Sequence, residues 1–413
     1  MMNDVRGSAD AKQADREGEP SANGAPNGSA VQLALHEDFH SIEAAWRDFE
    51  QHGDGTVFQA FDWLSTWHKH IGIRSGAQPV IAVGRRSDGE ILFLIPLMVE
   101  VGTTRRLTWL GSDLCDYNAP LLAASFSDHV GAGQFPPLWR DIRTLVQGHP
   151  HLQYDFVDLE KMPERVGAQP NPFLQLRTSA NASGAYVVQL SGSWDEFYAS
   201  RRSASRRKAD RNRTRRLADH GELQLITPGD ADDIRFTVEK LFEQKSWSFA
   251  RMGVCNLFTR PGYREFFLDL ATNPATRHLV RVSRLQVGSI WAAINLALTF
   301  RGSYYHVLCS YERRAVSPFG PGSAHLRELL RYALERGLKH FDFTIGDEPY
   351  KLEWSDKRIN LHDHVAPATP RGWPRAAATL ALRGAKRTIK QTPLLWRAFR
   401  TLRSTMAART KGE

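Results

Sequence analysis

The chain has 413 residues, of which 42% are hydrophobic and 24% are charged, and its formal net charge is +9. This length and composition are typical of a soluble globular protein with two or three domains. No run reaches the roughly 18 to 20 apolar residues that span a bilayer, and the N-terminus lacks the apolar core of a signal peptide. We therefore expect a cytoplasmic protein.

The three cysteines lie far apart in the chain, at Cys115, Cys255 and Cys309. An odd number without a C-x-x-C pair supports neither a disulfide framework nor a zinc knuckle. No activating base stands near any of them in the sequence. We expect each to be a buried small residue rather than a catalytic thiol.

Residues 1–30 consist mainly of small and polar residues, a composition that cannot bury enough surface to fold. We expect a disordered tail there and a first domain over residues 31–190. Trp63 and Trp67 share one face of a predicted helix, and we interpret them as core aromatics.

Four further elements are predicted in the first domain. Apolar spacing predicts helices over residues 41–49 and 138–148. Two β-prone runs joined by a Ser-Asp-Gly turn predict a hairpin over residues 79–101, and alternation predicts a strand over residues 154–159.

A second domain is expected over residues 191–366. Ser193 and Glu196 form the capping box of a helix that we expect to run towards Gly221. The middle of this helix, residues 201–216, carries nine Lys/Arg against one Asp. Such a charge suggests nucleic-acid binding. No aromatic residues interleave to stack bases, so a solvated or substrate-phosphate-facing helix is favoured and nucleic acid is not expected as a partner.

Two predicted helices, over residues 232–248 and 261–272, lead to three β-prone runs. Residues 281–298 form a predicted hairpin with its turn at residues 286–288, and residues 303–311 follow as a third strand. A three-stranded meander is the simplest arrangement of these runs.

The pattern then changes to that of a glycine turn and a helix. Residues 317–322 read SPFGPG, and apolar residues at helical spacing follow over residues 326–334. Gly337 stands where a C-terminal cap belongs. Residues 340–345 alternate as a strand that ends at Gly346.

A glycine turn between a strand and a helix is a candidate anion site. Free backbone N–H groups and the positive end of the helix dipole converge there. An isolated Gly-x-Gly also occurs as a simple tight turn. The candidate ligands for the phosphates of a cofactor are Ser317, Gly320, Gly322, Ser323 and Ala324.

The two halves of the chain repeat each other. The hairpin residues 83–97 recur at residues 282–296 with an offset of 199, and Asp155 matches Asp342 with an offset of 187. A shared order of elements indicates an ancient duplication. We expect a structural hydrogen-bonding role for Asp342 because of this echo. The first lobe has no counterpart of residues 320–322, so we expect it to be degenerate and to shape the acceptor side of the cleft.

Residues 317–354, SPFGPGSAHLRELLRYALERGLKHFDFTIGDEPYKLEW, resemble the core of the GNAT acyltransferases. They resemble more specifically the bacterial cellulose-biosynthesis (CelD-like) group, which is similar to the Fem-type aminoacyl transferases of peptidoglycan assembly. The resemblance covers roughly residues 31–366. It departs at Ser317, where GNAT proteins carry Gln or Arg, and at Pro321, which removes one amide donor. It implies an α/β (α+β) fold of two tandem GNAT-like lobes, each a mixed sheet flanked by helices.

The resemblance also implies transfer of an acyl group from acyl-CoA (acetyl-CoA) to an amine or hydroxyl of a sugar, polysaccharide or cell-envelope precursor. Such a reaction needs a base for the acceptor, donors for the oxyanion and an acid for the leaving group. Asp347 or Glu348 is the candidate base, Tyr350 the candidate acid, and Lys351 the candidate stabiliser of negative charge.

Three alternatives stay open. Composition alone would make residues 346–351 a surface turn with a Glu-Lys pair. Pro321 and the arginine-rich helix favour a Fem-type transferase that uses aminoacyl-tRNA. A non-catalytic protein that binds membrane or nucleic acid is the third possibility.

Residues 367–413 carry eleven Lys/Arg and one Glu, so the net basicity of the chain belongs to this tail. Apolar residues among these charges suit an amphipathic helix on anionic lipid, which would give peripheral contact with the inner membrane face. A helix docked on the body fits equally well. Before the tail, His362 and His364 share one face of a strand predicted over residues 358–365. No third ligand is evident, so we expect no metal.

Overall fold

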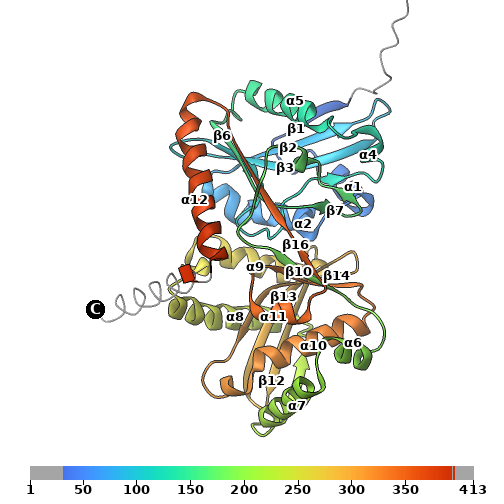
Figure 1. Cartoon of the computed structure of the whole chain (residues 1–413), viewed down its shortest axis with the longest axis vertical. Helices are drawn as coiled ribbons and strands as arrows, with labels where there is room; N and C mark the ends of the chain where they lie inside the picture. Colours follow the sequence, from blue (N-terminus) through green and yellow to red (C-terminus); the bar gives the residue numbers. More distant parts are fainter. Residues whose placement is uncertain (1–30, 393, 396–413) are drawn as a thin grey trace, which may run out of the picture.

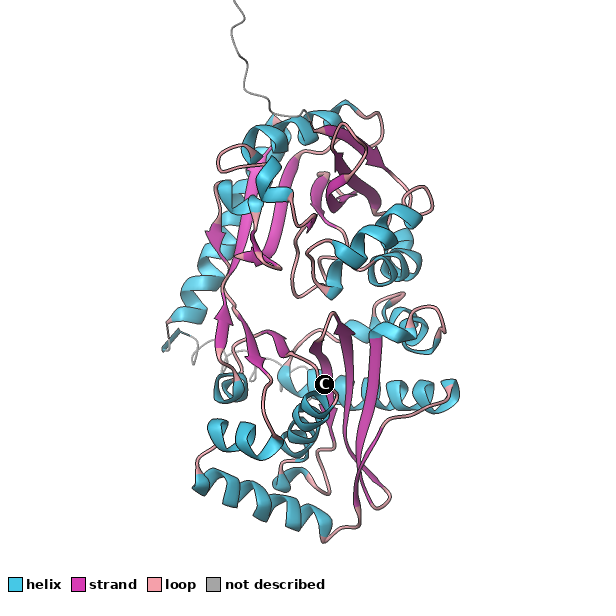
Figure 2. Cartoon of the chain, turned by 90° about the vertical axis from the view of Figure 1, so that its right-hand side faces the viewer, coloured by secondary structure: helices cyan, strands magenta, loops and turns pink. Residues whose placement is uncertain are grey.

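The computed structural model describes residues 31–392, 394 and 395. Two mixed β-sheets flanked by helices form two lobes, one above the other (Figure 1). Helices lie against the faces of both sheets (Figure 2). The predicted α/β fold of two tandem lobes is therefore confirmed, while the tail predicted over residues 1–30 lies outside the described residues.

The first sheet runs in the order β1-β2-β3-β4-β6-β17-β9, with β5 beside β3. Its strands are β1 (Gln32–His36), β2 (Gln78–Arg85), β3 (Ile91–Glu100), β4 (Arg106–Trp109), β5 (Leu121–Leu122), β6 (Phe156–Pro163), β9 (Ser179–Ala180) and β17 (Leu361–Pro367). The helices of the first half and its small extra ribbon are α1 (Glu43–His52), α2 (Phe61–Trp67), α3 (Ile73–Ser75), α4 (Phe126–His129), α5 (Phe135–Gly148), β7 (Arg165–Val166) and β8 (Gln169–Pro170).

The second sheet runs in the order β11-β12-β13-β14-β15-β10-β16. Its strands are β10 (Ala185–Gln189), β11 (Leu223–Ile226), β12 (Val280–Val287), β13 (Ile290–Phe300), β14 (Ser303–Tyr311), β15 (His340–Ile345) and β16 (Lys357–Ile359). The helices of the second half are α6 (Trp194–Arg201), α7 (Ala204–Ala218), α8 (Ala231–Met252), α9 (Tyr263–Thr272), α10 (Pro321–Glu335), α11 (Pro349–Trp354) and α12 (Trp373–Gln391).

The two sheets match position by position, which supports the predicted duplication. Hairpin β2–β3 corresponds to β12–β13, and both hairpins are antiparallel, as predicted. The next pairs, β4 with β6 and β14 with β15, are both parallel. A helix connects the strands of each parallel pair, α5 in the first lobe and α10 in the second.

Each lobe takes its sixth strand from the other half of the chain. β10 lies in the expected first domain, residues 31–190, but pairs with β15 in the second sheet, and β17 begins in the expected second domain, residues 191–366, but pairs with β6 in the first. The strand predicted over residues 358–365 is accordingly divided between β16 and β17. Neither boundary therefore coincides with a break in sheet pairing, because pairing depends on long-range register.

The single helix predicted from Ser193 towards Gly221 is wrong. The capping box is present, but the helix is interrupted at Arg202, whose φ of −130° is extended, and Ser203 caps a new helix, α7. The bend buries the guanidinium of Arg202, which pairs with Asp210 at 3.3 Å. An isolated sequence pattern does not reveal this buried ion pair.

A continuous hydrophobic core joins the two lobes. Trp63 and Trp67 are buried in it, as predicted. The ring of Trp63 lies 5.0 Å from that of Phe266 on α9, in an edge-to-face arrangement. Nearby, Asp269 of α9 accepts hydrogen bonds from the first lobe, including one of 2.7 Å from Lys69. The lobes are therefore fused by packing rather than loosely linked.

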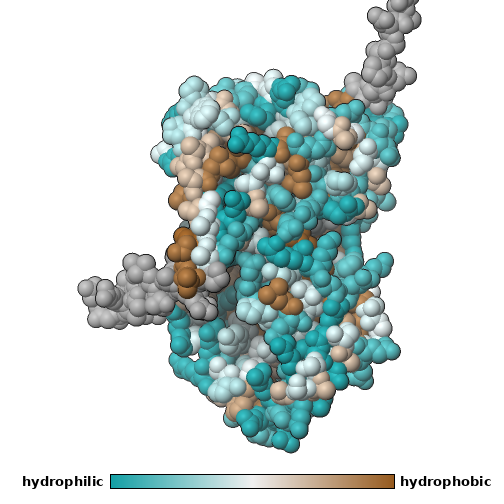
Figure 3. Space-filling model, in the orientation of Figure 1, coloured by the Kyte–Doolittle hydropathy of each residue, from teal (hydrophilic) through white to brown (hydrophobic). Residues whose placement is uncertain are grey.

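The described part of the basic tail is a docked helix. α12 runs along the first lobe (Figure 1), where Arg383 pairs with Asp158 at 2.7 Å, Glu160 at 3.1 Å and Asp363 at 3.8 Å. Ala376 of α12 is buried. Its outer face keeps Trp373, Leu380 and Leu382 exposed, and hydrophobic side chains show at this edge of the molecule (Figure 3). None of the described helices is both long and apolar enough to cross a membrane.

Replacement of Arg383 by Met tests this docking. The change leaves buried carboxylates without one cation, so we expect the free energy of unfolding to fall by about 3 kcal/mol, the cost of breaking a buried ion pair. Urea denaturation measures it. Lys386→Met, on the exposed face of the same helix, is the control. Equal stabilities of the two variants would show that α12 is not docked in solution.

Candidate functional site

The site begins where the parallel strands β14 and β15 separate. Their pairing is limited to three residues of each strand, and the last pair is Tyr305 with Asp342. Both strands continue beyond this point, to Tyr311 and Ile345 respectively. An opening in a parallel pair exposes backbone groups that would otherwise form the sheet ladder.

Two β-bulges cause the separation, one in each strand. The β13–β14 register shifts so that Ala297 faces both His306 and Val307. The β10–β15 register shifts so that Tyr186 faces Phe343 and Thr344. A bulge bends and twists its strand, and bulges are common beside active sites. Here both bulges directly follow the last β14–β15 pair.

Buried polar groups hold the second bulge. Thr344 has a φ of +60°, an unfavourable value for a β-branched residue. Its N–H donates to the Asp342 carboxylate at 2.7 Å, and that carboxylate also accepts the hydroxyl of Tyr117 from the first lobe at 2.8 and 3.0 Å. Burial raises the pKa of Asp342 to about 7. These contacts agree with the structural role predicted for Asp342.

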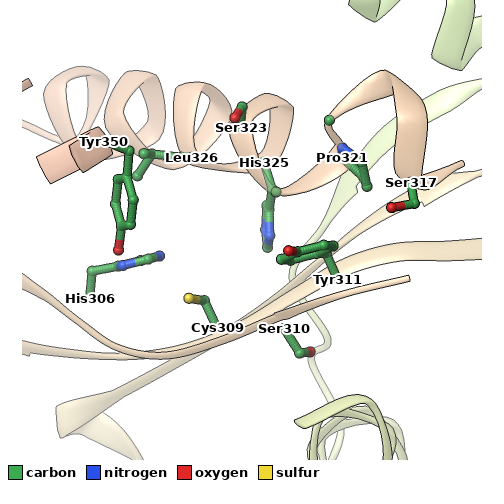
Figure 4. Close-up of a pocket in the computed structure, with 12 residues that line it drawn as sticks. His306, Cys309, Ser310, Tyr311, Ser317, Pro321, Ser323, His325, Leu326 and Tyr350 are labelled. Atoms are coloured by element: carbon green, nitrogen blue, oxygen red, sulfur yellow. The ribbon is translucent and has the colours of Figure 1, made fainter. Parts of the chain in front are cut away.

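A pocket of about 400 Å3 lies between the open end of β14 and the start of α10 (Figure 4). Ser317, Gly320, Gly322 and Ser323 of the predicted anion site line it, together with Tyr350 from the predicted catalytic set. The lining residues that the sequence analysis did not select are His306, Cys309, Ser310, Tyr311, Pro321, His325 and Leu326.

The glycine turn presents donors to this pocket. Gly320 is left-handed, with a φ of +66°, and directs the chain into α10. The Ala324 N–H already donates to the Gly320 carbonyl at 3.1 Å, and Pro321 has no N–H. The N–H groups of Gly322 and Ser323 thus stay available for an anion at the helix N-terminus.

Two histidines of the pocket are buried and neutral. His306 projects from the bulge of β14, and burial lowers its pKa to about 3, with a further contribution from the charge of Lys351. Burial also lowers the pKa of His325 to about 3, and its Nε2 lies 3.2 Å from the Ser283 hydroxyl. The one sequence signal for His306 was a polar residue within the apolar run of β14. The direction of its side chain depends on the bulge.

Tyr350 reaches the pocket from α11. Its hydroxyl points toward the ring of His306, and Cys309 lies beside them (Figure 4). Burial raises the pKa of the Tyr350 phenol well above its ordinary value, so the group stays protonated. A protonated phenol next to a neutral imidazole forms a pair of a proton donor and a proton acceptor.

The other three predicted catalytic residues do not line this pocket. Asp347 forms an ion pair with Lys390 of α12 at 2.8 Å. Burial opposes ionisation of Asp347, but Lys390 and hydrogen bonds from Gly184 and Tyr186 lower its pKa below the usual value. These partners hold the Asp347 carboxylate outside the pocket.

Lys351, the candidate stabiliser of negative charge, is buried. Its Nζ donates to the carbonyls of Ile345 at 2.8 Å and Thr344 at 3.4 Å, and it lies 3.1 Å from the Glu348 carboxylate. Glu348 is itself exposed. The helix α11 stands where the alternative reading had a surface turn, and it places Lys351 against the carbonyls that follow the bulge.

The expectation that all three cysteines are buried is partly corrected. Cys115 is buried as predicted, but Cys255 is exposed and Cys309 faces the pocket. His364 Nδ1 lies 2.9 Å from the Arg177 carbonyl, and a bulge interrupts the register between it and His362. Within the described residues, no group of three or more His, Cys, Asp or Glu is arranged to hold a metal ion.

The pocket lies within the part of the chain that matches a known family model. Residues 204–352 match the family model of the acetyltransferase (GNAT) domain. The structure of FemX is similar with a TM-score of 0.53 and 10% identity, over 80% of this chain and 96% of FemX. A conserved protein of unknown function from Bacteroides thetaiotaomicron is similar with a TM-score of 0.50 and 11% identity, over 80% of this chain and 99% of that one. No curated protein sequence matches the chain.

Replacement of Lys351 by Met tests the role of its ammonium. We expect a loss of about 1–3 kcal/mol in the free energy of unfolding, because buried carbonyls lose their donor. Denaturation and turnover are measured together, and Lys357→Met, at an exposed position of β16, is the control. Lost turnover with unchanged stability would show instead that Lys351 acts on the substrate.

Proposed function

We propose that this acyltransferase, whose second lobe contains a GNAT acetyltransferase domain, transfers an acyl group from acyl-CoA to an amine or hydroxyl of a sugar or cell-envelope precursor. The supporting observation is the pocket that joins the N-terminus of α10 to the open end of β14. We also propose a cytoplasmic location and membership of the CelD-like group. Residues 341–354 provide the sequence support for that membership.

The pocket offers both a phosphate site and a channel for the thioester arm. In this proposal, the Gly322 and Ser323 N–H groups bind the pyrophosphate, with the hydroxyls of Ser317 and Ser323 nearby. The arm then lies along β14, where unpaired backbone groups of the opened strand can bind its amides. The thioester carbonyl reaches the bulge at His306.

His306 and Tyr350 supply the proton transfers. The acceptor attacks the thioester carbonyl, and the new bond makes its N–H or O–H proton strongly acidic. Neutral His306 can then accept that proton although its pKa is low. When the C–S bond breaks, Tyr350 donates its proton to the departing thiolate. The tyrosinate regains a proton from the adjacent imidazolium, so both groups return to their starting states.

One observation favours a second donor, an aminoacyl-tRNA as in Fem-type transfer. The arginine-rich α7 lies beside the donor turn, where Thr214 of α7 accepts a 2.6 Å hydrogen bond from Arg327 of α10. Most basic side chains of α7 are exposed. A polyanion bound along α7 would therefore reach the same pocket.

Gly322→Glu tests the donor site. A Cβ at Gly322 would lie 3.3 Å from the Tyr311 ring, so the carboxylate enters the pocket and repels phosphate. We expect loss of acetyl-CoA binding in calorimetry with little change in thermal unfolding. Gly148→Glu is the control, because its added Cβ meets open space on the first lobe. Unchanged acetyl-CoA affinity in Gly322→Glu would overturn the acyl-CoA proposal. The same conclusion would follow if the wild-type protein bound tRNA but not acetyl-CoA.

Tyr350→Phe and His306→Gln test the proton transfers. Each is expected to lower kcat by about 100-fold, the lower range for loss of a general acid or base, while acetyl-CoA affinity stays within a few-fold. Tyr332→Phe, outside this pocket on α10, is the control. If CoA release proceeds at the wild-type rate in both variants, these residues do not transfer protons.

A further inference from the structure

A second pocket, of about 320 Å3, lies beside the first, between α8 and the chain that follows β14. Tyr311 lines both pockets. Ser310, which lines the first pocket, donates its hydroxyl to Gln244 of the second at 2.8 Å. The two pockets are therefore neighbours around the end of β14.

The pockets lie on opposite faces of the second sheet. α8 packs with Ile294, Leu296 and Leu298 of β13, whereas α10 packs with Ala297, which points to the other face. The first pocket lies on the α10 face and the second on the α8 face. A group placed at the opening between β14 and β15 is thus approached from the donor pocket on one face and from the second pocket on the other.

Guanidinium groups and aromatic rings stack on one another in and beside the second pocket. The guanidinium of Arg313 lies 4.4 Å from the ring centre of Tyr311 and 5.6 Å from that of Trp247, and Arg251 lies 4.9 Å from the same Trp247 ring. Arg313 also donates to the Ser248 hydroxyl at 3.0 Å. Stacking and this hydrogen bond hold the planar guanidinium in one orientation.

The two arginines of this pocket, Arg313 and Arg314, lack carboxylate partners within the described residues, although carboxylates are near. Glu312 accepts the backbone N–H groups of Arg314 at 2.6 Å and Val316 at 3.1 Å. Glu243 pairs with Lys240 at 2.7 Å. Arg313 and Arg314 form no ion pair in the described chain, so two guanidiniums are available to an incoming anion.

We propose that the second pocket binds a phosphate or carboxylate group of the acceptor, which makes the acceptor an anionic molecule. This inference rests on the proposed function, because it assigns the acceptor side of the same transfer. Arg313 and Arg314 hold the anion beyond the end of β14. An acceptor longer than a monosaccharide phosphate then extends along the α8 face to bring its nucleophile to the opening, since roughly 23 Å of strand, at about 3.3 Å per residue, separates Arg313 from His306. The other source of the same chemistry is the 3′-phosphate of CoA.

The test uses the full chain saturated with CoA, so that the donor pocket is occupied. Calorimetric titrations compare inorganic pyrophosphate, glucosamine 6-phosphate and glucosamine. We expect both anionic probes to bind at least about ten-fold more tightly than glucosamine, as charged hydrogen bonds predict. The double variant Arg313→Gln, Arg314→Gln should lose this difference. Arg336→Gln is the matched control, since Arg336 also stacks on a tyrosine, at 5.4 Å from Tyr332.

The outcomes separate the two sources and the two proposals. Absence of anion binding to the CoA-loaded wild type, or undiminished binding in the double variant, would overturn the inference. If the double variant weakens binding of CoA but not of 3′-dephospho-CoA, the pocket holds the donor and the acceptor assignment is wrong. Failure of the wild type to bind CoA would overturn the proposed function itself, whereas failure of the anionic probes alone leaves it standing.

Discussion

The hydrogen bonds of Asp342 determine the shape of the candidate site. Its carboxylate accepts the Tyr117 hydroxyl from the first lobe and the Thr344 N–H from its own strand. Asp342 is also the last residue of β15 that pairs with β14. The same side chain therefore joins the lobes and fixes the bulge at which the sheet opens. A buried polar group of this kind is stabilising only when its partners are all present.

The strained backbone of Thr344 is held by side chains on both sides of it in the sequence. A non-glycine residue at positive φ costs on the order of 1–3 kcal/mol and persists only where its surroundings hold it. Asp342 binds the N–H of Thr344 and Lys351 binds the carbonyls of Thr344 and Ile345. Lys351 lies on α11, the helix that also carries Tyr350 into the pocket. The bulge and the position of the proposed acid are thus consequences of one set of contacts.

The first lobe contains a related bulge, which does not line the pocket described above. Its strand β6 has a bulge at Lys161, whose φ is +57°, and the N–H of Lys161 donates to Asp363 of β17 at 3.0 Å. The Lys161 ammonium donates to the carbonyls of Ser112 at 2.6 Å and Cys115 at 3.0 Å. Asp363 also pairs with Arg383 of the docked α12. The duplicated feature supports helix docking in one lobe and a pocket in the other.

The sequence by itself determined the elements and the glycine turn, because these depend on local periodicity, capping and the φ preferences of glycine and proline. It predicted both hairpins and the helix α10, and it proposed Tyr350, which lines the pocket. It did not place His306, which only the β14 bulge directs into the pocket, or Lys351, whose ammonium on α11 is buried against carbonyls of β15. It also did not indicate that β10 and β17 exchange between the lobes. Bulges, buried ion pairs and strand exchange were decided by the tertiary structure, because each depends on partners far away in the chain.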